Sequence, residues 1–126
     1  MICADTGWTV GVQAHHIAQN EPTIAGVVRD VAEGHPHPPM PLGKLDEINA
    51  RHAEEFANVT IAETVALLRD NGALAAQTYR GLSDEQLALT TTLAEGYTVS
   101  VVDVIEWHAI GEIERHGEQI RRAIKA

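Results

Sequence analysis

The sequence predicts an all-α protein, a bundle of amphipathic helices. Three observations predict this class: apolar residues recur with helical spacing, capping signals precede several segments, and no stretch shows the alternation of a strand. Aromatic residues make up only 4% of the chain, so the core must consist of small and branched aliphatic side chains. At 126 residues, the chain is expected to form one domain, residues 1–126.

The first predicted helix runs from about Thr9 to Glu33. Pro22 lies in its middle and lacks an N–H, so we expect it to kink the helix or to split it after Asn20. The segment that follows, 34–43, holds four of the five prolines and is predicted to be a non-helical loop.

Three further helical segments are predicted. One covers about 44–57 and is rich in charge. The next opens with the capping-box pattern Thr60-Ile61-Ala62-Glu63 and runs to about Arg80, and a second such pattern, Ser83-Asp84-Glu85-Gln86, opens a short helical turn. The last predicted helix covers 98–124.

A faint internal repeat links the first and last helices. Gly7-Trp8-Thr9-Val10-Gly11-Val12 and Gly96-Tyr97-Thr98-Val99-Ser100-Val101 share the order glycine, aromatic, threonine, valine, small residue, valine. Each repeat is expected to open a long helix with its threonine as the N-cap.

Two polar residues interrupt the apolar face of the last helix. That face is predicted to carry Val101, Val102, Ile105, Ala109, Ile113, Ile120 and Ala123. His116 projects near its centre, and Glu112, one turn earlier, lies inside its edge. A carboxylate buried without a partner would cost several kcal/mol, so this pair needs something to bind, and a divalent metal ion is the economical candidate.

The first helix offers a third ligand. His16 borders its apolar face with Gln13 and Asn20 beside it, whereas the adjacent His15 is expected on the opposite side. His16 lies roughly 10 Å from the start of its helix, and His116 roughly 12 Å from the end of its own. If the two helices pack antiparallel, His16, Glu112 and His116 meet at one level. Two nitrogen ligands and one oxygen ligand, with open positions, are typical of a catalytic metal site.

Other interpretations of these residues remain open. A core histidine is often a satisfied packing residue, and Glu112 with His116 can form a simple ion pair. His108 lies further off the apolar face, so a role at a pocket edge or on the surface is expected. His35 and His37 fall in the proline-rich segment and His52 in a charged one, and all three are expected to be solvated.

Composition excludes several classes of partner. The formal net charge of −9 argues against binding to nucleic acid or an anionic membrane. No apolar run approaches the ~18 residues of a membrane span, and the first residues lack the basic and apolar regions of a signal peptide. The single cysteine, Cys3, excludes an internal disulfide and fits a reducing compartment, so a cytoplasmic location is expected.

In these motifs, the sequence resembles the DinB-like superfamily, which includes the N-terminal domain of mycothiol-dependent maleylpyruvate isomerase. The resemblance is carried by Gly7-Trp8-Thr9-Val10, Ala14-His15-His16-Ile17 and the segment from Glu112 to Ile120. Trp8 matches a tryptophan that opens the second bundle helix, and His16 matches the metal ligand that follows it. Glu112 and His116 match the two later ligands. The resemblance implies a four-helix bundle that binds a divalent metal ion, zinc by default and nickel or iron as possible occupants.

The resemblance also implies chemistry. Several members are transferases or isomerases that use a low-molecular-weight thiol, which predicts a small-molecule substrate with Gln13, Asn20 and His108 in the second shell or substrate pocket. A non-catalytic metal- or ligand-binding bundle and a metal-free structural bundle are the alternatives. The family normally has a helix before the tryptophan, and only residues 1–7 precede Trp8. A bundle lacking that first helix leaves an apolar face uncovered, which predicts a homodimer or larger homo-oligomer.

Overall fold

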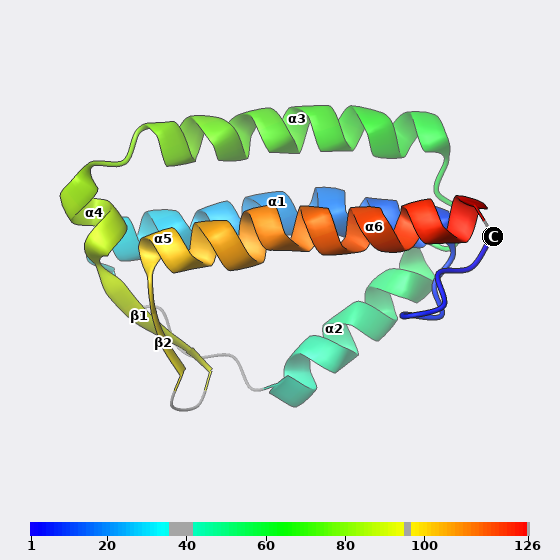
Figure 1. Cartoon of the computed structure of the whole chain (residues 1–126), viewed down its shortest axis with the longest axis horizontal. Helices are drawn as coiled ribbons and strands as arrows, with labels where there is room; N and C mark the ends of the chain where they lie inside the picture. Colours follow the sequence, from blue (N-terminus) through cyan, green and yellow to red (C-terminus); the bar gives the residue numbers. More distant parts are fainter. Residues whose placement is uncertain (36–41, 95–96, 126) are drawn as a thin grey trace.

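The computed structural model describes residues 1–35, 42–94 and 97–125, and it confirms the all-α class. Three long helical stretches run along the molecule (Figure 1). They are α1 (Val10–Ala32), α3 (Ile61–Arg80) and a C-terminal stretch formed by α5 (Val101–Asp103), the π-helix η1 (Val104–Ile110) and α6 (Gly111–Lys125). α1 is central: it packs along α3 and also along η1 and α6, to which it is antiparallel.

α2 (Leu42–Glu55) is not aligned with these three stretches. It is inclined to them, with its C-terminal end near the N-terminal end of α1 (Figure 1). Its bounds differ slightly from the predicted 44–57, because Leu42 and Gly43, expected in the loop, already belong to the helix. The short helix α4 (Asp84–Ala88) follows α3.

Most helix starts follow the predicted capping signals. The Thr9 side chain accepts a hydrogen bond from the Val12 N–H at the start of α1. Thr60 and Ser83 each form a complete capping box, the first at α3 and the second at α4. These contacts satisfy backbone N–H groups that have no partner within the helix.

The expected break at Pro22 is wrong in its stronger form. α1 is a single helix with Pro22 inside it, and it is not split after Asn20. A proline removes one backbone hydrogen bond, but α1 packs against helices on two sides. Tertiary packing of this extent outweighs one missing bond, because packing supplies most of the stability of a protein helix.

The expectation that no segment forms strands is also wrong. β1 (Thr90–Ala94) and β2 (Tyr97–Ser100) form an antiparallel pair in which Thr91 lies opposite Val99. The two strands are rich in β-branched residues, which favour extended backbone. The last helix therefore begins at Val101, with Ser100 as its N-cap, so only the first copy of the repeat has its threonine as the cap.

The buried face of α6 differs from the predicted apolar face because the π-helix η1 precedes it. A π-helical turn holds more residues than an α-helical one, so it rotates α6 relative to the start of the stretch. Ile113, predicted on the buried face, is 45% exposed, whereas His116 is buried. Gly111 ends the π-helix, and a side chain there would approach the Glu106 carbonyl oxygen to 3.2 Å.

The apolar core lies at the hairpin end of the bundle. It is formed by Val28, Val31, Val99, Val101 and Val104. At the other end, the faces of α1 and α6 that meet carry polar side chains, so the fold separates an apolar core from a polar site.

Candidate metal centre

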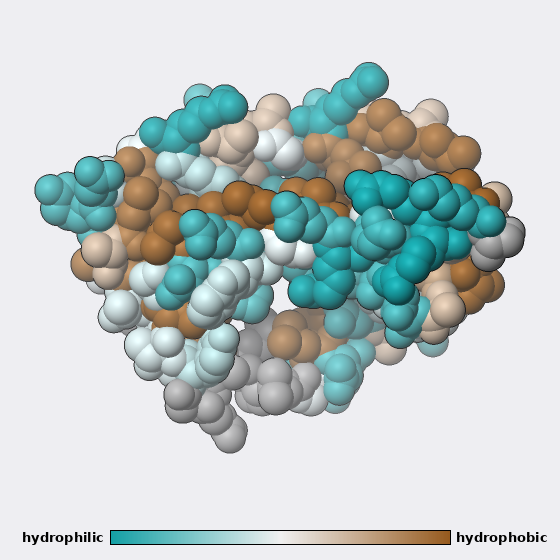
Figure 2. Space-filling view, viewed as in Figure 1, coloured by the Kyte–Doolittle hydropathy of each residue, from teal (hydrophilic) through white to brown (hydrophobic). Residues whose placement is uncertain are grey.

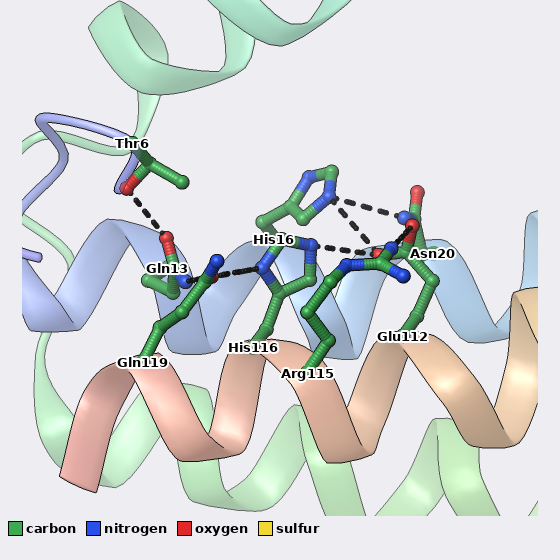
Figure 3. A network of polar contacts seen from close by, with 8 residues as sticks. All are labelled: Thr6, Gln13, His16, Asn20, Glu112, Arg115, His116 and Gln119. Atoms are coloured by element: carbon green, nitrogen blue, oxygen red, sulfur yellow. Dashed lines mark hydrogen bonds and ion pairs between the residues drawn. The ribbon is translucent and has the colours of Figure 1, made fainter. Parts of the chain in front are cut away.

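His16 of α1 meets Glu112 and His116 of α6 (Figure 3). Glu112 Oε2 lies 2.8 Å from His116 Nε2 and 3.8 Å from His16 Nε2. All three potential ligand atoms lie within 4.8 Å of one another, close enough to hold one ion. The i, i+4 spacing places Glu112 and His116 on one side of α6, and the antiparallel α1 brings His16 to the same level.

The cluster is largely shielded from solvent. His16 and His116 are each 9% exposed, and Glu112 is partly buried. The Trp8 ring packs edge-on against the His16 imidazole, with the ring centroids 5.1 Å apart. The tryptophan just before α1 therefore covers one side of the cluster.

Glu112 Oε2 shows that these residues fit a metal ion. Among the described residues, this buried oxygen has no hydrogen-bond partner, although His116 Nε2 is close by. When His116 is neutral with its Nε2 lone pair toward the carboxylate, this short contact brings two acceptor atoms together, whereas a protonated His116 would pair with Glu112. A buried carboxylate oxygen without a hydrogen bond is costly, and a cation bound between it and the two imidazole nitrogens would remove that cost.

Two glutamines and a threonine orient His116. His116 Nδ1 lies 2.7 Å from Gln119 Oε1 and 3.0 Å from Gln13 Nε2. Gln13 Nε2 donates to Gln119 Oε1, and Thr6 Oγ1 donates to Gln13 Oε1 over 2.8 Å (Figure 3). Gln119 Oε1 can accept a hydrogen bond from a proton on His116 Nδ1, and this tautomer leaves the Nε2 lone pair for a metal ion.

Sequence reasoning placed Gln13 beside the cluster but missed Gln119 and Thr6. Gln119 could have been found, because it follows His116 by three residues and so lies next to it on the helix. Thr6 precedes the first helix, and no periodic signal identifies it. Asn20 Nδ2, predicted beside His16, lies 3.2 Å from His16 Nε2, so a bound ion would replace this contact.

The charges of the cluster depend on one another. Burial would raise the pKa of Glu112, but its contacts with His116, Arg115 and His16 outweigh that effect and lower the pKa. Contact with Glu112 raises the pKa of His116, whereas burial lowers that of His16. Arg115 binds the other carboxylate oxygen, Oε1, over 2.8 Å, which leaves Oε2 facing the imidazoles.

Two expectations about histidines outside the cluster are wrong. His52, expected to be solvated, is 7% exposed, and His15, expected on the opposite side from the core, is 6% exposed. Their Nε2 and Nδ1 atoms lie 2.8 Å apart, and Phe56 stacks on His15. The reason is the position of α2, which covers the side of α1 that carries His15. Burial and the neighbouring His16 and His15 lower the pKa of His52 to about 4.

The remaining histidines lie outside the cluster. His108 lies on the wall of a cleft beside the cluster, one turn from Glu112. His35 is exposed, and its Nδ1 is 3.6 Å from Glu33 Oε2. His37 lies outside the described residues.

A comparison with family models shows which superfamily the chain belongs to. The model of the DinB superfamily matches residues 2–120, and the chain belongs to that superfamily. Its members are typically metal-binding helical proteins. Comparison with curated proteins and with solved structures gives no match. Along the described segments, no helix is long and apolar enough to cross a membrane.

Proposed function

We propose that this protein binds one divalent metal ion through His16, Glu112 and His116 and catalyses thiol-dependent transfer or isomerisation of a small molecule. The orphaned oxygen of Glu112, held between two imidazole nitrogens, is the observation that carries the metal site. Family membership supports it, because related helical bundles typically bind metals.

Zinc is the default occupant, with nickel or iron as alternatives, because two imidazole nitrogens and one carboxylate oxygen suit all three. Three protein ligands leave room for an exogenous ligand, as in catalytic rather than structural sites. When bound, such an ion lowers the pKa of a coordinated thiol or water and so supplies a nucleophile near neutral pH.

The chain's own residues prepare this site. Gln119 and Gln13 contact His116 Nδ1 and hold the ring so that Nε2 faces the site of the ion. Arg115 neutralises the outer oxygen of Glu112 and fixes the carboxylate plane. Trp8 and the surrounding helices limit solvent access, which strengthens electrostatic interactions inside the site.

A metal-free bundle is the second candidate, favoured by the 2.8 Å contact between Glu112 and His116. In that account, the carboxylate and a protonated His116 form a stabilising ion pair. We favour the metal site because His16 Nε2 also faces Glu112 Oε2, 3.8 Å away, and because members of the superfamily typically bind metals.

We also propose that the protein acts as a homodimer in the cytoplasm. Ile110, Ile113 and Ile124 of the C-terminal helices are 49%, 45% and 55% exposed and lie near one another around the helix. Figure 2 shows a hydrophobic band running between α3 and the C-terminal helices. The single cysteine, Cys3, is unpaired and buried, and burial raises the pKa of its thiol, which fits a reducing compartment.

The catalytic part of the proposal is tested with low-molecular-weight thiols and electrophilic acceptors. Metal-loaded wild type should show turnover with at least one pair, and Glu112→Ala should lose it. His108→Ala, which leaves all three ligands intact, is the matched control for metal binding. Equal rates for wild type and Glu112→Ala across the panel would contradict the enzyme proposal and favour a binding module.

A further inference from the structure

A cleft of about 540 Å³ opens beside the candidate metal centre. It lies between α1, α2 and the C-terminal stretch, and Figure 2 shows the surface hollowed between α2 and that stretch. His16 and Glu112 of the cluster form part of its wall. A molecule at this end of the cleft would therefore lie next to an ion held by the cluster.

The polarity of the cleft changes along its length. On α1 the wall runs from His16 to Val27, roughly 16 Å further along the helix at 1.5 Å per residue. The antiparallel C-terminal stretch contributes Glu112 beside His16 and Val104 toward the other end, where Leu93 of β1 also lines the cleft. The end at the cluster is thus polar, and the end at the hairpin is apolar.

The wall formed by α2 carries apolar side chains that the bundle does not bury. Leu45 and Ile48 line the cleft, yet they are 41% and 43% exposed. They are three residues apart on the helix and so lie on one face. Exposed apolar side chains that converge on a concave site are typical of a ligand pocket.

The charges of the cleft argue against a multiply anionic ligand. Among its described lining residues, Arg51 is the sole arginine or lysine, and it is exposed. Glu55 and Glu112 face the same space, so the lining offers more carboxylates than cationic side chains. A ligand with one metal-binding group and an uncharged body fits this lining best.

We propose that the cleft binds the aliphatic chain of an amphipathic small molecule whose single head group, a thiolate or carboxylate, reaches the metal centre. The placement of the head group rests on the proposed function. The chain would lie between α1 and α2, in contact with Leu45 and Ile48, and would end near Val104 and Leu93. Burying each methylene there contributes about 0.8 kcal/mol, which corresponds to about a fourfold gain in affinity.

The test is the affinity of straight-chain alkanethiols of increasing length, measured by calorimetry below their solubility limits. The full chain is used both loaded with zinc and metal-free. Affinity for the loaded protein should rise about fourfold per methylene until the cleft is filled. Leu45→Asn and Ile48→Asn should flatten this rise, whereas Leu74→Asn, which replaces a 63% exposed leucine on α3 outside the cleft, should leave it unchanged.

The outcomes separate this inference from the proposed function. If zinc binds stoichiometrically but affinity does not depend on chain length, the inference is wrong and the metal site stands. An equal effect of Leu74→Asn and Leu45→Asn would also overturn it. If zinc does not bind, the proposed function fails, and the chain-length dependence of the metal-free protein then decides whether the cleft holds an aliphatic chain.

Discussion

Replacing Gln119 with alanine should weaken zinc binding about 10- to 100-fold, although Gln119 is not a ligand. Gln119 Oε1 accepts hydrogen bonds from His116 Nδ1, 2.7 Å away, and from Gln13 Nε2. Its loss frees the imidazole to rotate and to adopt the other tautomer, which would turn a protonated Nε2 toward the ion. The expected loss of affinity corresponds to about 1.4–2.7 kcal/mol.

Metal-free stability should fall as well. The substitution removes the acceptor that Gln119 offers to His116 and to Gln13, whose side chain is fully buried. A buried group without a partner costs about 1–3 kcal/mol, and partial access of water to position 119 places the expected loss near the lower limit. Denaturant unfolding of the metal-free protein measures this loss of folding stability separately from the metal affinity.

The matched control is Gln119→Glu. A carboxylate keeps the acceptor for both bonds and makes His116 a more basic ligand, so zinc affinity should equal or exceed that of wild type. Affinity is measured by competition with a chromophoric chelator at fixed pH. If Gln119→Ala bound zinc as tightly as wild type, the argument that this amide orients His116 would be refuted.

Three further predictions concern the metal ligands, His52 and the oligomeric state. His116→Ala should abolish stoichiometric metal binding, whereas His108→Ala should leave metal content nearly unchanged, and loss of metal in the second variant would show that the helix face is misassigned. His52, with its pKa lowered from 6.5 to about 4, stays neutral when folded while the unfolded chain takes up a proton, so the metal-free protein should lose stability as pH falls from 6.5 toward 4. Protonation of the unfolded His52 lowers the free energy of unfolding by at most about 1.4 kcal/mol per pH unit. If the free energy of unfolding of His52→Gln fell with pH as steeply as that of wild type, this prediction would be contradicted. Sedimentation at tens of micromolar should give a mass above that of the 13.6 kDa monomer, and a monomer mass would exclude the proposed homodimer.

Local sequence signals predict the features that depend on neighbours along one helix. The caps at Thr9, Thr60 and Ser83 involve residues three positions apart, and all three are present. Glu112 and His116 meet because they are four residues apart on α6. His16 joins them because the two long helices pack antiparallel, a condition under which the sequence reasoning placed the three residues at one level.

The features that sequence reasoning missed depend on contacts between distant segments. The burial of His52 depends on α2 lying over the start of α1, and the charged residues around it indicate an exposed face instead. The hairpin from Thr90 to Ser100 depends on pairing between two short strands that lack clear alternation. The rotation of α6 depends on the π-helix η1, and a pattern analysis that assumes a constant period of 3.6 cannot detect it.

The metal content of protein purified without a histidine tag and without added metal tests the central claim most directly. Wild type should contain one equivalent of a divalent ion, identified by anomalous scattering at a position between His16, Glu112 and His116. The variant with alanine at all three positions should contain none. Tight binding of one equivalent by that triple variant, or a wild-type protein that takes up no divalent ion when one is supplied, would contradict the account.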